Sequence, residues 1–345
     1  MALNLGLLLF SFIVTALLIV PFIDILYKLH FTRRIEAGKT GKKSFFDTVH
    51  DIKAGTPVGG GVMVVFCVSV LFAILFPLIA YMGVKISAVY NVRAEVNILF
   101  FTFLSYASLG FYDDFVKLFR KPEQGKIGMW VGLRRKQKFA LQWLFAGIIA
   151  FLIYRDLNVT ILHLPILDTT LNLGILYIPF AAFVIVSFVN AVNITDGLDG
   201  LAAGLLLICL FAFWIIAANS FDTPLSIFIS LWIGALIAFL YFNIWPARIF
   251  MGDSGALAFG ATLAVIGLVT GKIFVLVIIG GVFIIEALSS FIQIFGWRVL
   301  GHPIFLIAPA HLLLQKIGWE EPKIVMRAWL AGLILALFGL WLALI

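Results

Sequence analysis

The chain has 345 residues, of which 63% are hydrophobic and only 12% are charged, and its mean hydropathy is +1.15. A soluble domain carries about twice that charged fraction, so the composition excludes a water-soluble globular enzyme. It also excludes a disordered chain, because apolar residues dominate throughout. The net charge is +7, but the positive residues fall in short loops, which favours membrane orientation over nucleic-acid binding.

Ten apolar segments are long enough to cross a membrane as helices, which takes about 20 residues each. In chain order they are 4–29, 58–81, 96–118, 139–155, 174–191, 200–219, 224–243, 255–271, 273–297 and 324–345. We therefore predict an all-α polytopic membrane protein with about ten transmembrane helices, forming a single domain over residues 1–345.

The basic residues are distributed unevenly between the two sides of this arrangement. Alternate loops carry nearly all of them: 28–57, 117–138, 244–254 and 298–327. The exceptions are Lys85, Arg93, Arg155 and Lys272. Basic loops remain in the cytoplasm, so we expect these four loops to be cytoplasmic and both termini to lie on the outer, periplasmic side. The outer stretch 156–173 alternates apolar residues with turn formers and predicts a short hairpin.

Five carboxylates stand at the predicted cytoplasmic ends of the helices, far apart in the sequence. They are Asp113, Asp114, Asp196, Asp199 and Asp253. Charged groups at membrane depth are costly, which favours a functional interpretation. Adjacent residues on a helix point about 100° apart, so Asp113 and Asp114 cannot both face one spot, and we expect them to have different roles.

Polar residues recur at every third position in the segment NAVNITDGLDGLA, at Asn190, Asn193, Asp196 and Asp199. A straight helix would not place all four on one face. Gly197 and Gly200 therefore predict that one helix ends here and another begins. Two amides and two carboxylates so arranged can bind a divalent metal ion, a ribose and the edge of a base.

A third acidic segment, FMGDSGA, contains Asp253 between two glycines. Its carboxylate is a hard oxygen ligand suited to Mg²⁺, and the preceding Phe250 could stack on a base. Among the basic residues, Lys53 and Lys138 are our candidates for binding phosphate. Glu286 lies inside the ninth predicted helix, where we expect it to have a hydrogen-bonding partner.

These motifs resemble the polyprenyl-phosphate N-acetylhexosamine-1-phosphate transferases, and within that superfamily the phospho-N-acetylmuramoyl-pentapeptide transferase branch. The matching segments are KAGTPVGGG, GFYDDFVK, NAVNITDGLDGLAAG, FMGDSGALAFGA, EALSSFIQ and GWEEPKIVMRAW. The resemblance implies a Mg²⁺-dependent enzyme of the bacterial cytoplasmic membrane, with its active site facing the cytoplasm. Its implied substrates are UDP-N-acetylmuramoyl-pentapeptide and undecaprenyl phosphate, and its implied products are lipid I and UMP. Membrane lipids would surround it, and a homodimer is plausible for this family.

The resemblance also implies roles for individual residues. Asp253 and Asn193 would hold the Mg²⁺, and Asp113 would deprotonate or orient the lipid phosphate beside Asp114. The remaining implied contacts to substrate, most of them to the nucleoside, are Lys53, Lys138, Asn190, Asp196, Gly197, Leu198, Asp199, Asn243 and Phe250. His311 is the remaining catalytic candidate. Whether Asp113 acts as a base or as a covalent nucleophile is left open.

Two departures from the family pattern keep alternatives open. The usual Thr-Pro-Thr is Thr-Pro-Val at Val58, and of three consecutive histidines only His311 is present, followed by Leu312 and Leu313. The missing histidines favour a transferase for UDP-N-acetylglucosamine, whereas EALSSFIQ and GWEEP favour the muramoyl donor. A membrane transporter is a more remote alternative, because the acids lie at one face instead of the midplane. A non-catalytic scaffold is disfavoured by the retention of all five carboxylates.

Overall fold

The computed structural model describes residues 2–33, 53–119, 135–164 and 169–345, and these residues are mostly helical. Among them, ten helices are long and apolar enough to cross a membrane, which confirms the prediction of a polytopic helical protein. The elements in chain order are α1 (Ala2–Lys28), α3 (Gly60–Tyr81), α4 (Val92–Phe119), α5 (Arg135–Asp156), β1 (Ile161–Leu164), β2 (Thr169–Asn172), η1 (Gly174–Leu176), α6 (Tyr177–Thr195), α7 (Leu201–Asn219), α8 (Thr223–Asn243), α9 (Gly252–Val269), α10 (Ile273–Ile279), α11 (Gly281–Phe295), η2 (Gly296–Leu300), α12 (Ala310–Lys316) and α13 (Glu321–Leu344).

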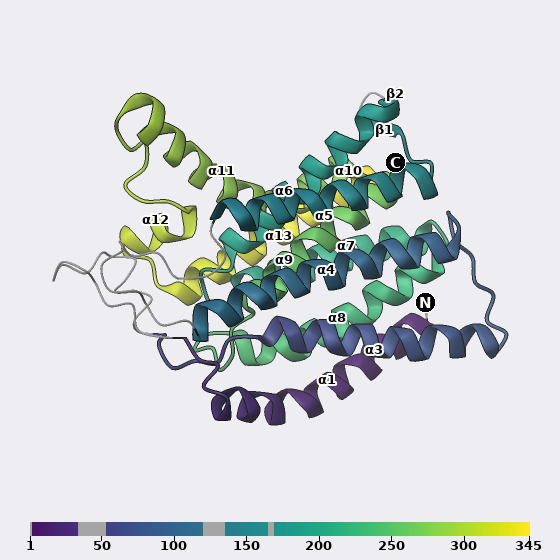
Figure 1. Ribbon diagram of the computed structural model, residues 1–345, viewed down its shortest axis with the longest axis horizontal. Coiled ribbons are helices and arrows are strands. Elements are labelled where there is room, and N and C mark those ends of the chain that lie inside the picture. The colour runs from purple at the N-terminus through teal and green to yellow at the C-terminus, as the bar shows by residue number, and fades with distance from the viewer. Residues whose placement is uncertain (1, 34–52, 120–134, 165–168) are drawn as a thin grey trace.

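The long helices run between two ends of the molecule (Figure 1). One end carries both chain termini and the β1–β2 hairpin, and the opposite end carries α12. The hairpin is antiparallel, with Ile161 opposite Asn172 and Leu164 opposite Thr169, and it confirms the prediction for 156–173. Both termini share one end, as the charge distribution predicts. That this end is the outer one stays a prediction, and the basic loops 28–57 and 117–138 lie partly outside the described residues.

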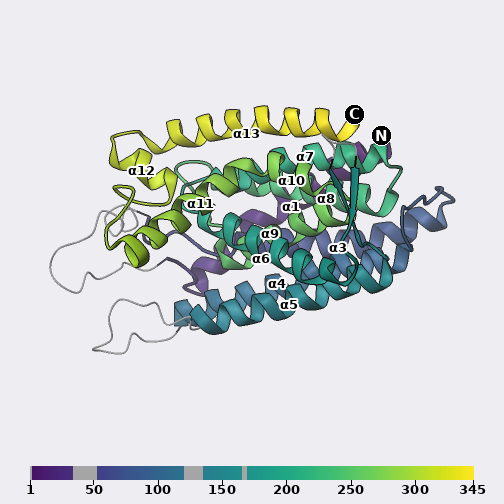
Figure 2. The ribbon, with the colours of Figure 1, turned by 90° about the horizontal axis from the view of Figure 1, so that it is seen from above.

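Helix α9 is the centre of the bundle, and 89% of its residues are buried. Helices α4 and α6 pack against it, α13 packs along α7, and α1 packs along α8. Figure 2 shows α13 along one edge of the molecule and the α4–α5 pair along the opposite edge, with α9 and α6 between them. Polar side chains in the first turn of α9 are therefore surrounded by side chains from the neighbouring helices.

The expected uninterrupted helix over 273–297 is instead two helices, α10 and α11, which meet at Gly280. A β-carbon at Gly280 would lie 2.7 Å from the ring of Phe188 on α6, so only glycine fits this close approach. Two consecutive glycines are a common cause of a helix break. Beyond the break, α11 leans away from the bundle (Figure 1). Only 17% of the apolar window in Gly281–Leu300 is buried, and its exposed apolar side chains suit a lipid environment.

Candidate active site

Two aspartates and two lysines from three helices form a charge cluster. The Lys138 Nζ on α5 donates to Asp113 Oδ2 on α4 at 2.9 Å and to Asp253 Oδ2 on α9 at 2.5 Å. Lys117 Nζ, one turn after Asp113, lies 3.0 Å from the same Asp113 oxygen and 2.6 Å from the same Asp253 oxygen. The cluster therefore balances two negative charges with two positive ones. Sequence analysis selected three of its members and missed Lys117, whose i+4 spacing from Asp113 was the available signal.

Asp114 faces a different partner from its neighbour Asp113. Its Oδ1 accepts the backbone N–H of Asp253 at 3.1 Å, and its Oδ2 accepts that of Ser254 at 3.0 Å. These N–H groups belong to the first turn of α9 and have no partner within the helix. The close approach depends on Gly110, where a β-carbon would lie 2.2 Å from the carbonyl oxygen of Asp253. Asp114 thus caps α9 and holds Asp253 in place, as the expected division of roles between the two acids implies.

The two asparagines of the NAVN segment also differ. Asn193 Nδ2 donates to Asp253 Oδ1 at 3.0 Å, which places this amide directly against the charge cluster. Asn190 Nδ2 instead donates to Gln142 Oε1 on α5 at 3.0 Å and to the carbonyl oxygen of Val186 at 2.7 Å. The Asn190 contacts tie α6 to α5, so a direct contact of Asn190 with substrate stays a prediction.

We expect the Asn190–Gln142 pair to set the spacing of α5 and α6. Gln142 lies one turn from Lys138, and Asn190 lies one turn from Asn193, so the pair supports two of the groups that contact Asp253. Gln142→Ala should lower the free energy of unfolding by about 1–2 kcal/mol, the usual cost of an unpaired buried polar group. It should also lower turnover several-fold.

A double-mutant cycle with Asn190→Ala checks this prediction, using turnover and thermal unfolding of the purified protein. Because the two side chains share one interaction, the double variant should be little worse than either single variant. Fully additive effects would contradict the coupling between them.

The loop between α6 and α7 confirms the predicted helix break. Helix α6 ends at Thr195, and Gly200 precedes α7 with a φ of 75°, a left-handed conformation that favours glycine. The Asp199 carboxylate in this loop accepts Lys53 Nζ at 2.5 Å and the backbone N–H of Ala247 at 2.9 Å. Leu198 is buried, so only its backbone is a candidate for contact with a ligand.

Glu321, at the start of α13, completes this second ionic group. Its Oε1 accepts Lys53 Nζ at 2.5 Å and the backbone N–H of Asp199 at 2.7 Å. Sequence analysis did not assign Glu321 to the site, although it lies in the GWEEP segment quoted for the resemblance. Lys53 is therefore held between two carboxylates, and the second of them is contributed by the last helix of the chain.

Two further candidates bind mainly to the protein itself. Asn243 Oδ1 accepts the N–H of Gly200 at 3.2 Å, and its Nδ2 donates to the carbonyl oxygen of Ile249 at 2.9 Å. The backbone of Phe250 pairs with the segment around Pro57, and the Arg33 guanidinium lies 5.5 Å from the centre of the Phe250 ring. Asn243 thus fixes the loop that presents Phe250, and stacking of Phe250 on a base stays a prediction.

Asp196 has an unusual ionisation. Burial, followed by the nearby Asp253 carboxylate, raises the pKa of this carboxyl to about 7, although the positive charges of Arg33 and Lys53 oppose the shift. A carboxyl with a pKa near 7 is partly neutral under physiological conditions and can then donate a hydrogen bond.

The resemblance implies that Asp196 contacts the nucleotide, and on that expectation the shift predicts a pH dependence of nucleotide binding. Below pH 7 Asp196 is mostly neutral and would add no negative charge beside a bound anion, whereas above pH 7 it is mostly ionised and would repel the anion. If only the neutral form binds, the affinity for UMP should fall roughly tenfold between pH 6 and pH 8. Titration calorimetry on the wild type and on Asp196→Asn measures this. The ligand titrates equally in both, so the excess fall should be absent from Asp196→Asn, and equal profiles would contradict the assignment.

His311 lies in the first turn of α12 and packs against the loop between α6 and α7. The residue is 2% exposed, and a β-carbon at Gly197 would lie 2.4 Å from its Nε2. Glu286 Oε2 lies 2.9 Å from the other ring nitrogen, Nδ1, so Glu286 has the partner that its position in the ninth predicted helix led us to expect. The histidine and the Gly197 loop, 114 residues apart in the chain, are therefore neighbours.

The donor set fits a Mg²⁺ ion that also uses substrate oxygens. Mg²⁺ is usually bound by one or two carboxylates together with phosphates and water. Asp253 and the amide of Asn193 supply such oxygens, and among the described residues no group of three or more histidine, cysteine or acidic side chains could form a metal site alone. In the structure, lysines engage Asp253 Oδ2, so a metal ion there would share or replace those contacts.

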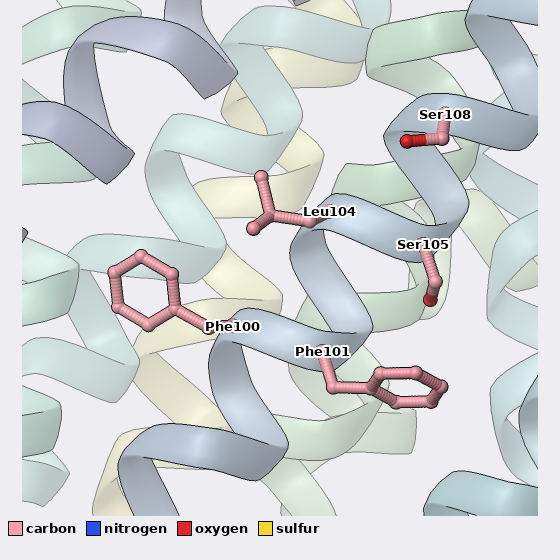
Figure 3. A pocket seen from close by; sticks show the side chains of 5 residues that line it. All are labelled: Phe100, Phe101, Leu104, Ser105 and Ser108. Carbon is pink, nitrogen blue, oxygen red and sulfur yellow. The ribbon is translucent and has the colours of Figure 1, made fainter.

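A shallow pocket elsewhere lacks this chemistry. It lies along the middle of α4, and its lining residues, shown in Figure 3, are Phe100, Phe101, Leu104, Ser105 and Ser108. None of these side chains is charged.

The fold and the site together define a polytopic membrane protein with a lysine–carboxylate cluster suited to phosphate chemistry at one end of its bundle. Residues 96–271 match glycosyl transferase family 4. The chain is 36% identical over 332 residues to the phospho-N-acetylmuramoyl-pentapeptide-transferase of Geobacillus sp. strain WCH70, covering 96% of this chain and 95% of the relative. It is also 36% identical over 335 residues to the enzyme of that name from Bacillus subtilis strain 168, covering 97% and 96%. The chain therefore belongs to glycosyl transferase family 4 and is a transferase.

Proposed function

We propose that this protein transfers phospho-N-acetylmuramoyl-pentapeptide from its UDP donor to undecaprenyl phosphate, forming lipid I and UMP in the first membrane step of peptidoglycan synthesis. The observation that carries the proposal is the cluster of Asp113, Asp253, Lys117 and Lys138, contributed by three helices to one end of the bundle. The relatives described above are named for this activity, and the chain matches them over nearly their whole length.

The location of the cluster suits a lipid acceptor. We place this end of the bundle at the cytoplasmic face of the bacterial inner membrane, with both termini outside, because the predicted loops at this end are rich in lysine and arginine. A polyprenyl phosphate has its charged group at the membrane surface and its tail in the bilayer. Groups at the ends of membrane helices can reach that phosphate without drawing the tail into water.

In the proposed reaction an oxygen of the lipid phosphate attacks the phosphorus attached to the sugar, and the bond from that phosphorus to the UMP oxygen breaks. Phosphoryl transfer depends mainly on alignment and on neutralising charge. Lys117 and Lys138 supply two positive charges beside Asp113 and Asp253. A Mg²⁺ ion held by Asp253 and Asn193 would neutralise the diphosphate as a Lewis acid.

Asp113 would orient the lipid phosphate or accept its proton, and direct attack by the lipid needs no covalent intermediate. Exchange of labelled UMP into the UDP-sugar in the absence of lipid acceptor tests this. Exchange requires a phospho-enzyme, so we expect none above the level of Asp113→Asn. Rapid exchange in the wild type alone would instead make Asp113 the nucleophile.

The nucleoside would lie at the loop formed by Asp196, Gly197 and Asp199, between His311 and Phe250. Asp199 is fixed there by Lys53, and Asp196 is able to donate a hydrogen bond when neutral. Leu312 and Leu313 occupy the positions after His311, and we propose that the remaining contacts suffice for the muramoyl donor.

The deciding experiment measures Mg²⁺-dependent UMP release from purified protein with undecaprenyl phosphate. UDP-N-acetylmuramoyl-pentapeptide and UDP-N-acetylglucosamine are compared side by side, with Asp253→Asn as the inactive control. Release with the muramoyl donor alone supports the proposal. Release with the glucosamine donor alone would overturn it in favour of the sister activity, and release with neither from folded protein would overturn the transfer itself.

A further inference from the structure

Glu286 on α11 binds His311 at three points. Its carboxylate accepts the backbone N–H of His311 at 3.1 Å from Oε1 and 3.3 Å from Oε2, and Oε2 lies 2.9 Å from the ring Nδ1. Both side chains are buried, with 6% of Glu286 and 2% of His311 exposed. One acid therefore holds both the first turn of α12 and the imidazole that this turn carries.

The chemistry of this contact determines the protonation of the ring. Both Glu286 oxygens already accept the backbone N–H of His311, and a carboxylate only accepts hydrogen bonds, so in this arrangement Nδ1 is the donor and carries a hydrogen. Nε2 is then the lone-pair nitrogen of the neutral ring. It points at Gly197, where a β-carbon would lie 2.4 Å away, and the hydrogen bonds of His311 to described residues use its backbone N–H and Nδ1 instead. The free nitrogen thus faces the loop that bears Asp196 and Asp199.

We propose that Glu286 is a positioning residue, which holds His311 with Nδ1 protonated and Nε2 directed at the Gly197 loop to contact the bound donor substrate. The inference rests on the proposed function for the identity of that donor. In this chain Leu312 and Leu313 follow His311, so the short helix α12 carries a single imidazole. The orientation of that ring is correspondingly important.

Direct observation of the ring tests the geometry without any turnover. The chain has five histidines, and ¹⁵N NMR of protein labelled in the histidine rings assigns His311 by the signal that His311→Gln removes. At a pH where the ring is neutral, we expect Nδ1–H in the wild type. In Glu286→Ala the Nε2–H form, which a free histidine side chain prefers, should become dominant. An Nε2–H tautomer in the wild type would overturn the proposal.

Kinetics separate positioning from simple support of the fold. Removal of a group that orients a metal-bound histidine typically costs 10–100-fold, and by analogy we expect Glu286→Ala to lower kcat about tenfold while KM for the lipid acceptor changes by less than about threefold. Glu286→Gln keeps an oxygen that can accept the Nδ1–H, and it should restore most of the activity. Glu320→Ala, at an exposed glutamate in the loop before α13, should behave like the wild type.

The outcomes distinguish failure of the positioning role of Glu286 from failure of the proposed function. A loss in Glu286→Ala that follows only the fraction of folded protein, with the wild-type tautomer retained, would overturn the positioning role and leave the proposed function intact. An inactive wild type would overturn the proposed function, and the NMR measurement would still decide whether Glu286 sets the His311 tautomer.

Discussion

Asp253→Asn should abolish transfer, with turnover falling by about 10³-fold or more. The carboxylate of Asp253 accepts three donors, from Lys117, Lys138 and Asn193, and an amide cannot replace the negative charge that holds both ammonium groups. Preorganised charge of this kind is commonly the largest single contribution to catalysis. UMP release by purified protein measures the effect.

The same substitution should leave the protein folded. Asparagine has nearly the same shape as aspartate, and Lys117 and Lys138 both keep Asp113 as a partner, so we expect the free energy of unfolding to fall by roughly 1–3 kcal/mol. Thermal unfolding in detergent checks this control. Turnover above one tenth of the wild-type value would remove Asp253 from the centre of the mechanism.

Asp114→Ala should destabilise the protein far more than Asp113→Ala, although the two residues are adjacent. Without Asp114, two N–H groups at the start of α9 lose their partners in the core of the bundle. At about 1–3 kcal/mol for each unpaired group, we expect the free energy of unfolding to fall by roughly 2–4 kcal/mol. Turnover should also fall by about 10²-fold, because Asp253 would no longer be held in position.

Asp113→Ala is the matched control for this prediction. It removes a carboxylate whose described partners are Lys117 and Lys138 and should reduce turnover with a smaller change in thermal stability. Asp24→Ala, at an exposed position on α1, should change neither quantity. Equal melting temperatures for Asp113→Ala and Asp114→Ala would show that Asp114 does not cap α9.

The membrane spans were predictable because the bilayer restricts the choices of the chain. Backbone N–H and C=O groups in hydrocarbon must form their hydrogen bonds within the segment, so a run of about 20 apolar residues becomes a helix. The exception was 273–297, where hydropathy is continuous but Gly280 allows a break. The glycine pair was visible in the sequence, but the close approach of Gly280 to the ring of Phe188 was not, because Phe188 lies on another helix.

The candidate site residues were recognisable because charged side chains are costly to place at membrane depth, and because these residues occur in specific motifs. The helix rotation of about 100° per residue showed that Asp113 and Asp114 must diverge, but not which of them would cap a helix. Glu321 and Gln142 were not singled out, because no local pattern indicates their partners.

The sequence by itself determined the class of protein, the number of spans, the hairpin and the acids of the site. These features depend on composition and on short-range periodicity. Only the tertiary structure decided that Lys53 bridges Asp199 and Glu321, that Asp114 caps α9, and that Glu286 contacts His311. Such contacts depend on the rotation and the axial offset of each helix relative to the others, which are set only when the whole bundle packs around α9.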